Sequence, residues 1–345
     1  MTTASEPFVR VIHPSPVARA RAGAALCALA AILALAGCKG GRNGGASRSE
    51  GQTRATEAAE LGSRLAEQGL LDAALVEFER AIEINPTLTT AYMGAGDIHR
   101  ARGDYASAES QYAIAAEIAP QEFDPQYWHG FALQMLDRLS EAVRAYLRAL
   151  AIKPEDFNTN LNLATAYLQL GENEQAVVYA ERAVRVNPED GAARMNLGAA
   201  YANVGRHAEA IEQYEAATER VPEPSPEMLL NLAESHGKVG RYAEMTGTVR
   251  EVIARRPSAQ AYERLGSALF RSQDYAGARG AFEQAAQLDP NHYPAWNGIG
   301  VCLLNQYLWS GKTDLAALDE ARNALRRSLQ VRRDQPHIVE LLTRY

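Results

Sequence analysis

The side chains that could act as nucleophiles, bases or metal ligands are few and lie far apart in the sequence. The seven histidines are scattered, with neither an HExxH pair nor a local cluster of His, Cys and Asp. The three cysteines, Cys27, Cys38 and Cys302, are too few for a disulfide framework or a four-ligand zinc site. Residues 310–313 read Ser-Gly-Lys-Thr, but Gln306 stands where a phosphate-binding loop needs its first glycine. We therefore expect no catalytic residue, no metal, no cofactor and no small-molecule substrate.

Cys38 is the exception, because it ends an uncharged run of mostly Ala and Leu that extends from Ala22 to Gly37 and follows three arginines. A helix of that length spans only about 24 Å, less than the ~30 Å hydrocarbon core of a bilayer. A cationic start, a short apolar core and small residues at its end are typical of an export signal. The run ends in Leu-Ala-Gly-Cys, which resembles the lipobox of bacterial lipoproteins. The resemblance implies cleavage after Gly37 and lipidation of Cys38.

On this interpretation residues 1–37 are a lipoprotein signal peptide, and residues 38–54, rich in Gly and Ser, are a flexible tether. Lys39, rather than Asp, follows the cysteine, which in lipoproteins favours the outer membrane over the inner one. We therefore expect a lipid-anchored protein of the bacterial cell envelope, at the periplasmic face of the outer membrane. The alternative is an uncleaved helical anchor in which Cys38 is an ordinary small residue.

The rest of the chain repeats itself every 34 residues, which indicates a series of stacked structural units. Small residues, mostly alanine, stand twelve and five residues before a recurring proline, and a bulkier residue, mostly aromatic, stands eight before it. The prolines follow the period with a one-residue slip that is later recovered: Pro86, Pro120, Pro154, Pro188, Pro222, Pro257 and Pro290. This pattern resembles the tetratricopeptide repeat, in which each unit is a pair of antiparallel helices.

The resemblance implies an all-α fold, a right-handed α-α superhelical solenoid of about eight tetratricopeptide repeats. In the second unit we expect helices at 89–101 and 105–118, joined by a left-handed turn at Gly103 and ended by Pro120. The array is predicted over 55–333, followed by a C-terminal capping segment at 334–345. Its units are predicted at about 55–88, 89–122, 123–156, 157–190, 191–224, 226–258, 259–292 and 293–333.

The last unit differs from the others, because nine extra residues separate Gly300 from Ala321. They bring in Tyr307, Leu308 and Trp309. One interpretation is that both helices are longer; the other is a protruding contact loop.

Stacked units would form a concave face lined by the first helix of each repeat. Apolar and aromatic side chains are expected there in register, at Met93, Tyr127, Leu161, Met195 and Leu230, and Tyr127, Trp128 and Phe131 form an aromatic cluster beside them. An asparagine ladder accompanies them at Asn162, Asn196 and Asn231, and amide side chains can pair with a peptide backbone. A similar ladder holds extended polypeptide in the repeat arm of the O-linked N-acetylglucosamine transferases. The alternative is that both sets serve packing and turns within the array.

The net charge of −7 disfavours nucleic acid and favours neutral or basic protein partners. The sequence thus predicts a non-enzymatic scaffold that binds extended or helical peptide segments of other proteins and is held to a membrane by a lipid anchor. It resembles the repeat lipoproteins that assist pilus and secretin assembly or recruit peptidoglycan enzymes. The competing hypothesis is a repeat arm that presents substrates to a separate glycosyltransferase or peptidase.

Overall fold

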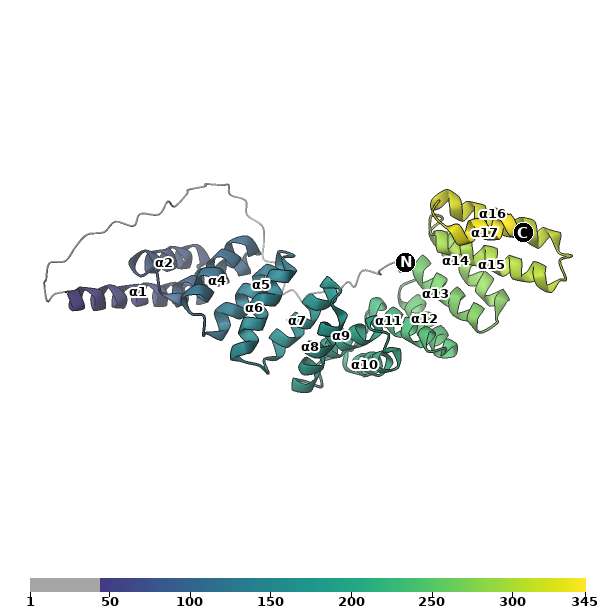
Figure 1. Ribbon diagram of the computed structural model, residues 1–345. Coiled ribbons are helices and arrows are strands. Elements are labelled where there is room, and N and C mark those ends of the chain that lie inside the picture. Colours follow the sequence, from purple (N-terminus) through teal and green to yellow (C-terminus); the bar gives the residue numbers. More distant parts are fainter. Residues whose placement is uncertain (1–43) are drawn as a thin grey trace. The chain divides into compact units, whose positions relative to one another are not determined.

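The computed structural model describes residues 44–345, with side chains from residue 50 onward, and these residues form seventeen α-helices and no strand (Figure 1). The all-α prediction is therefore confirmed. The predicted signal peptide and Cys38 lie outside the described residues. Within residues 44–345 no helix is both long and apolar enough to cross a bilayer. The chain divides after Glu172 into two compact units, unit 1 before this point and unit 2 from Asn173 to Tyr345.

Unit 1 contains the first three helical pairs and the first helix of the fourth. In each pair the two helices pack against one another, and each second helix also packs against the first helix of the next pair. The helices are α1 (Gly44–Glu67), α2 (Leu71–Ile84), α3 (Thr89–Ala101), α4 (Tyr105–Ile118), α5 (Phe123–Met135), α6 (Leu139–Ile152) and α7 (Phe157–Leu170).

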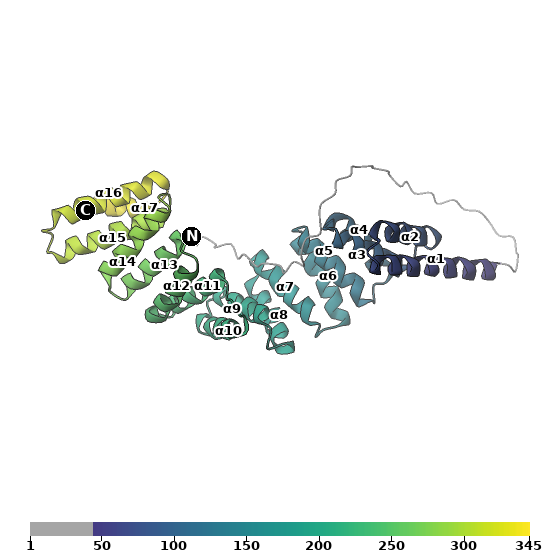
Figure 2. The same ribbon diagram turned by 180° about the vertical axis from the view of Figure 1, so that it is seen from behind.

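Unit 2 begins with the second helix of the fourth pair and ends with a short helix that packs on α16 (Figure 2). Ile338 of this last helix is buried in the terminal core. The helices are α8 (Asn173–Val186), α9 (Gly191–Asn203), α10 (His207–Arg220), α11 (Pro226–Lys238), α12 (Tyr242–Arg255), α13 (Ala259–Arg271), α14 (Tyr275–Leu288), α15 (Tyr293–Trp309), α16 (Leu315–Val331) and α17 (Pro336–Arg344).

Local sequence signals explain where the helices begin and end. The helices predicted at 89–101 and 105–118 are α3 and α4 with the same bounds. Between them Gly103 has a φ of 75°, a left-handed conformation that only glycine adopts without a Cβ clash. The side chain of Asp104 then accepts a hydrogen bond from the backbone N–H of Ser107 at 3.1 Å and caps α4. Asp137 and Gln273 hold the equivalent left-handed turn without glycine.

Close packing within several of the pairs depends on an aromatic ring placed over a glycine. The rings of Tyr112 and Tyr146 are fully buried, and each lies against the glycine of the preceding helix. A Cβ atom at Gly96 would lie 2.6 Å from the Tyr112 ring, and one at Gly130 would lie 2.8 Å from the Tyr146 ring. The helices can therefore approach this closely only because these positions carry no side chain.

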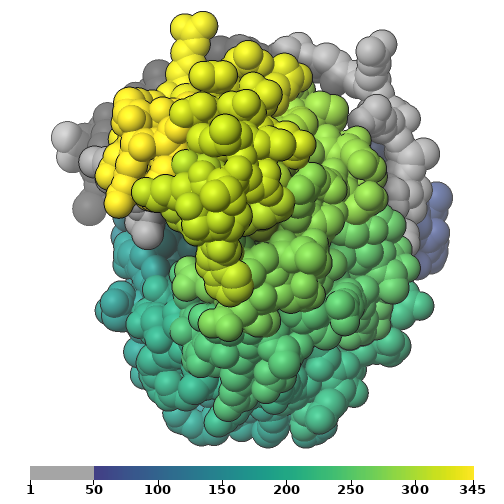
Figure 3. All heavy atoms as spheres, turned by 90° about the vertical axis from the view of Figure 1, so that its right-hand side faces the viewer, coloured from purple at the N-terminus to yellow at the C-terminus, as the bar shows by residue number. Residues whose placement is uncertain are grey.

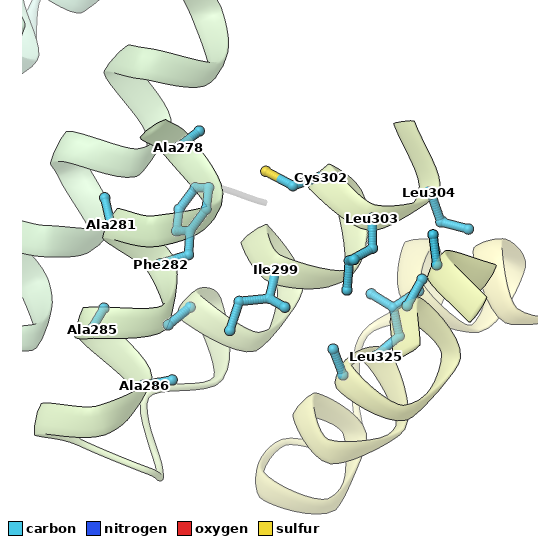
Figure 4. Packing of buried hydrophobic residues seen from close by; sticks show 14 of the residues in the cluster. Ala278, Ala281, Phe282, Ala285, Ala286, Ile299, Cys302, Leu303, Leu304 and Leu325 are labelled. Carbon is cyan, nitrogen blue, oxygen red and sulfur yellow. The ribbon is translucent and has the colours of Figure 1, made fainter. Parts of the chain in front are cut away.

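The core of the last two pairs follows the same plan, with an added layer toward the C-terminus. Phe282 of α14 lies among alanines of its own helix and faces Ile299 of α15 (Figure 4). Leu325 of α16 closes the other side of α15 next to Leu303. Figure 3 looks toward this C-terminal end, where the yellow atoms of the last helices lie foremost.

Two predictions about segment boundaries are settled by helix lengths. The tether predicted over 38–54 is wrong from residue 44 onward, because α1 starts at Gly44 and continues to Glu67. Once Ala55, Ala58 and Ala59 are packed in the array, each further N-terminal residue can extend the helix without a new nucleation step. In the last pair both helices have 17 residues, so the nine-residue insertion lengthens both of them.

Candidate partner-binding surface

The residues predicted to bind partners all lie on the first helices of their pairs. Unit 1 carries one group on α3, α5 and α7, which follow one another in Figure 2; unit 2 carries the other group on α9 and α11. The residues of unit 1 are Met93, Tyr127, Phe131, Leu161 and Asn162, and those of unit 2 are Met195, Asn196, Leu230 and Asn231.

In unit 1 the structure gathers aromatic rings along α5 into one half-buried group, which we call the aromatic panel. It consists of Phe123, Tyr127, Trp128 and Phe131. Consecutive rings of the panel touch, with centroids 5.8 Å apart for Phe123 and Tyr127, 4.9 Å for Tyr127 and Trp128, and 5.5 Å for Trp128 and Phe131. Such a row presents a large apolar area with little rotamer freedom, which suits the capture of apolar peptide side chains.

Arg100 on α3 holds the panel in place, and the sequence did not predict this contact. The guanidinium of Arg100 stacks 4.2 Å above the ring of Trp128, and it donates hydrogen bonds to Asp97 at 3.1 Å and to the Tyr112 hydroxyl at 3.2 Å. Tyr112 in turn donates to Asp97 at 2.7 Å. Burial, and after it the Asp97 carboxylate, raises the pKa of Tyr112 far above its ordinary value, so this hydroxyl stays protonated.

The following helix also contacts the panel. The side-chain amide of Asn162 on α7 donates a hydrogen bond to the Tyr127 hydroxyl at 3.3 Å. The ring of Tyr127 lies 6.0 Å from that of Tyr146, which is fully buried. Burial, and secondarily the charge of Asp156, raises the pKa of Tyr127. Tyr127 and Asn162 are thus partly structural, since each supports the other across two repeats.

Phe131 is the panel member with the looser surroundings. Its ring contacts Tyr105 at a centroid distance of 6.4 Å, in addition to Trp128. It is half-buried. Phe131 is therefore less closely tied to the core than Tyr127, whose ring packs beside the buried Tyr146.

The asparagine ladder of unit 2 is uneven. Asn196 is only 3% exposed, so its amide is not presented to solvent as predicted. Asn231, at the same register position, is exposed. Asn196 lies between Ala193 and Ala200 on α9, both fully buried. Of the two, only Asn231 is placed to pair with a bound backbone.

The apolar residues predicted to line the concave face are each partly buried by packing and partly exposed. Met93 is half-buried and packs against Ala108, Tyr112 and Ala132. Leu230 is half-buried and packs against Leu229 and the neighbouring helices. Leu161 and Met195 are also half-buried. Each side chain therefore contributes to the stack and still leaves part of its surface exposed.

The residues with possible reactivity are inert or isolated. Cys302 is buried, and burial raises the pKa of its thiol to about 12, so the nucleophilic thiolate is not formed near neutral pH. His236 is 4% exposed and therefore packs within the array. In the part of the chain that the structure describes, no group of three or more His, Cys, Asp or Glu side chains could hold a metal ion.

Family models of the tetratricopeptide repeat match residues 59–123, 136–171, 161–225 and 259–292, together more than half of the chain. The chain is a tetratricopeptide repeat protein. The proline period and the paired small residues predict tetratricopeptide repeats, and the helical pairs and the family match confirm this prediction. Sequence reasoning missed Arg100 and Asp97, although their spacing of three residues on a helix is typical of an ion pair.

Solved structures show the same fold at low sequence identity. A tetratricopeptide repeat protein from Parabacteroides merdae superimposes with a TM-score of 0.50 at 21% identity, covering 74% of this chain and 97% of that one. PilF of Pseudomonas aeruginosa gives a TM-score of 0.50 at 18% identity, covering 64% of this chain and 99% of PilF. These similarities establish the fold.

A curated human protein shares a short stretch with this tetratricopeptide repeat protein. Protein O-mannosyl-transferase TMTC1 of Homo sapiens is 37% identical over 59 residues, 17% of this chain. The match spans only 7% of the length of TMTC1 and 6% of that of its Mus musculus counterpart. The shared stretch is thus a small part of those proteins.

Proposed function

We propose that this tetratricopeptide repeat protein is a membrane-anchored scaffold that holds polypeptide segments of other proteins of the bacterial envelope. The observation that carries the proposal is the half-exposed aromatic panel on α5, braced by Arg100 on one side and Asn162 on the other. A braced aromatic surface is preorganised, so a partner pays little conformational entropy on the protein side when it binds. Repeat proteins of this family are generally scaffolds without catalytic groups of their own.

The chemistry of the panel indicates which segments it would hold. Arg100 is paired with Asp97, and the ammonium of Lys153 lies 4.3 Å from the centroid of the Phe123 ring. Arg100 and Tyr112 stack on Trp128, so the apolar surface comes from Phe131, and Asn162 beside Tyr127 carries an amide that can accept from or donate to a peptide backbone. We expect extended segments with large apolar side chains.

The anchoring half of the proposal rests on Cys38. The lipobox-like ending Leu-Ala-Gly-Cys supports lipidation, and Lys39 supports sorting to the periplasmic face of the outer membrane. A diacylglyceryl group with a further acyl chain would hold the protein stably, because one chain alone gives only marginal binding. The partners would then be envelope assemblies such as pilus, secretin or peptidoglycan machinery, for which the fold shared with PilF offers an analogy.

Substitution Cys38→Ser is expected to abolish incorporation of labelled palmitate and to move the protein from the membrane fraction to the soluble fraction. The reason is that the thiol is the atom that would carry the diacylglyceryl group. Palmitate label is followed by gel autoradiography in a bacterial host, and the control is Cys302→Ser, whose thiol is buried and must leave labelling unchanged. Full membrane retention of Cys38→Ser would show that an uncleaved helix anchors the chain instead.

A second candidate is a repeat arm that presents substrates to a separate enzyme. The short similarity to a protein O-mannosyl-transferase favours a glycosyltransferase as that enzyme. Co-purification of the tagged chain with such an enzyme, lost when Phe131 is replaced by alanine, would favour this role over a structural scaffold.

A further inference from the structure

A second binding site is formed in unit 2, between the second helix of the seventh pair and the first helix of the eighth. A cavity of about 540 Å³ opens there between α14 and α15. Its lining comes from both helices: Tyr275, Ala276, Arg279, Gly280, Glu283, Cys302, Asn305, Gln306 and Trp309. None of these residues belongs to the aromatic panel, so the two sites can be changed independently.

The cavity exists because α15 is longer than its counterparts. It has 17 residues where α13 has 13, and the extra residues add about 6 Å, roughly one turn, at its C-terminal end. This turn carries Trp309, whose ring stands edge-on to that of Tyr275 at a centroid distance of 5.3 Å. The extended hairpin of α15 and α16 is visible at the yellow end of the chain (Figure 1).

The floor of the cavity is made of small groups. Gly280 has no atom within 4 Å of the place where a Cβ would stand, so the space above it is open. Cys302 extends from α15 toward α14 and closes the base (Figure 4). The aromatic walls and this small floor leave room for one large apolar side chain.

Apolar side chains continue from the cavity onto the tip of the hairpin. Trp309 is 74% exposed, Leu315 63% and Leu308 38%, which is costly for a surface that stays in water. The equivalent hairpin ends of the other repeats lack this extension, since their first helices stop about one turn earlier. The exposed tip thus provides a contact area around the mouth of the cavity.

Charge around the cavity selects among possible occupants. Arg279 is shared by two carboxylates, with Nε 2.7 Å from Glu283 and Nη2 3.5 Å from Glu320. Gln306 donates to the carboxylate of Asp314 at 2.7 Å. Lys312 lies in the turn before Asp314, and these three carboxylates outnumber the two cations, Arg279 and Lys312. An acidic peptide or an anionic lipid surface would therefore be disfavoured.

We propose that this cavity binds a partner polypeptide segment in which a large apolar residue stands next to Lys or Arg. The apolar side chain enters the cavity beside the contacting rings of Tyr275 and Trp309 and covers Gly280. The neighbouring cation lies on the face of Trp309 and pairs with Glu283 or Glu320, whose charges Arg279 only partly neutralises. The amide of Asn305 is placed to pair with the bound backbone.

The test compares Gly280→Leu with Gly247→Leu. Both glycines are exposed, have no atom within 4 Å of a Cβ, and stand at the same register position, on α14 and α12. Leucine at 280 fills the cavity, whereas leucine at 247 does not touch it. Random peptides displayed on phage are first selected for binding to the full chain. Peptides that also bind the Gly280→Leu variant are then removed, and the affinities of the remaining peptides for both variants are measured by calorimetry.

We expect peptides that carry a large apolar residue beside Lys or Arg, bound at least about ten-fold more weakly by Gly280→Leu and equally well by Gly247→Leu. The same peptides with Glu in place of the basic residue should lose binding. The inference is overturned if no peptide depends on Gly280, or if the dependent peptides are acidic. It is also overturned if Gly280→Leu weakens binding to phosphatidylglycerol vesicles while peptide binding is unchanged. Gly280→Leu should leave peptide binding at Phe131 unchanged, so a failure of this inference can be distinguished from a failure of the proposed function.

Discussion

Replacing Gly130 by alanine is expected to lower the stability of unit 1 by about 2–3 kcal/mol, although alanine is the better helix former. The new Cβ would lie 2.8 Å from the ring of Tyr146. That ring cannot move aside cheaply, because it is fully buried and its hydroxyl donates a hydrogen bond to Gln134 at 2.8 Å. Relief of the clash therefore requires the two helices of the third pair to separate.

The control for this prediction is Gly247→Ala, in which the added Cβ meets no atom within 4 Å. Its helix should gain about 0.5–1 kcal/mol from the propensity difference alone. Urea unfolding followed by circular dichroism gives the midpoints of both variants, analysed by a nearest-neighbour scheme because repeats need not unfold in one step. Equal stabilisation by both substitutions would mean that the ring does not pack on Gly130 as described.

Phe131→Ala is expected to weaken peptide binding at the panel by about ten-fold or more, with helix content preserved. The ring of Phe131 contacts Trp128 and Tyr105, both half-buried, so its removal is expected to disturb the core little. Tyr127→Ala is expected to cost more stability, since it removes the ring next to Tyr146 and the acceptor of Asn162. The binding effect is measured by calorimetry with peptides selected on the unmodified chain.

Leu147→Ala is the matched control, because Leu147 lies on α6, is 38% exposed and belongs to no part of the panel. It removes a comparable apolar side chain from the surface of the same unit. If both variants bind the peptides as well as the unmodified chain does, the panel is a packing element and not a binding surface.

The fold was predictable because its determinants are local and recur. The prolines, the turn glycines and the alanine pairs each act within one repeat, so the period alone placed α3 and α4 at their observed bounds. The left-handed turns at Gly69, Gly103 and Gly240 follow from the same logic. The start of α1 was missed because glycine-rich composition suggests a coil, whereas helix already packed at Ala55 can propagate backward.

The binding surface was only partly predictable, because register gives the helix face but not the depth of a side chain. Asn196 and Asn231 share a register position, yet the first is buried and the second exposed. The bracing of Trp128 by Arg100 joins two repeats, and no pattern within one repeat reveals it. The cavity beside Trp309 likewise depends on where an added helical turn ends relative to α14.

In-cell photocrosslinking from position 131 tests most directly whether the panel holds partner segments. A photoreactive phenylalanine analogue replaces Phe131, and a second chain carries it at Arg144, an exposed position on α6 of the same unit. We predict discrete protein adducts from position 131 that mass spectrometry assigns to envelope proteins, with the crosslinked residues in apolar segments, and few or none from position 144. Adducts of equal yield from both positions, or none from position 131, would contradict the account.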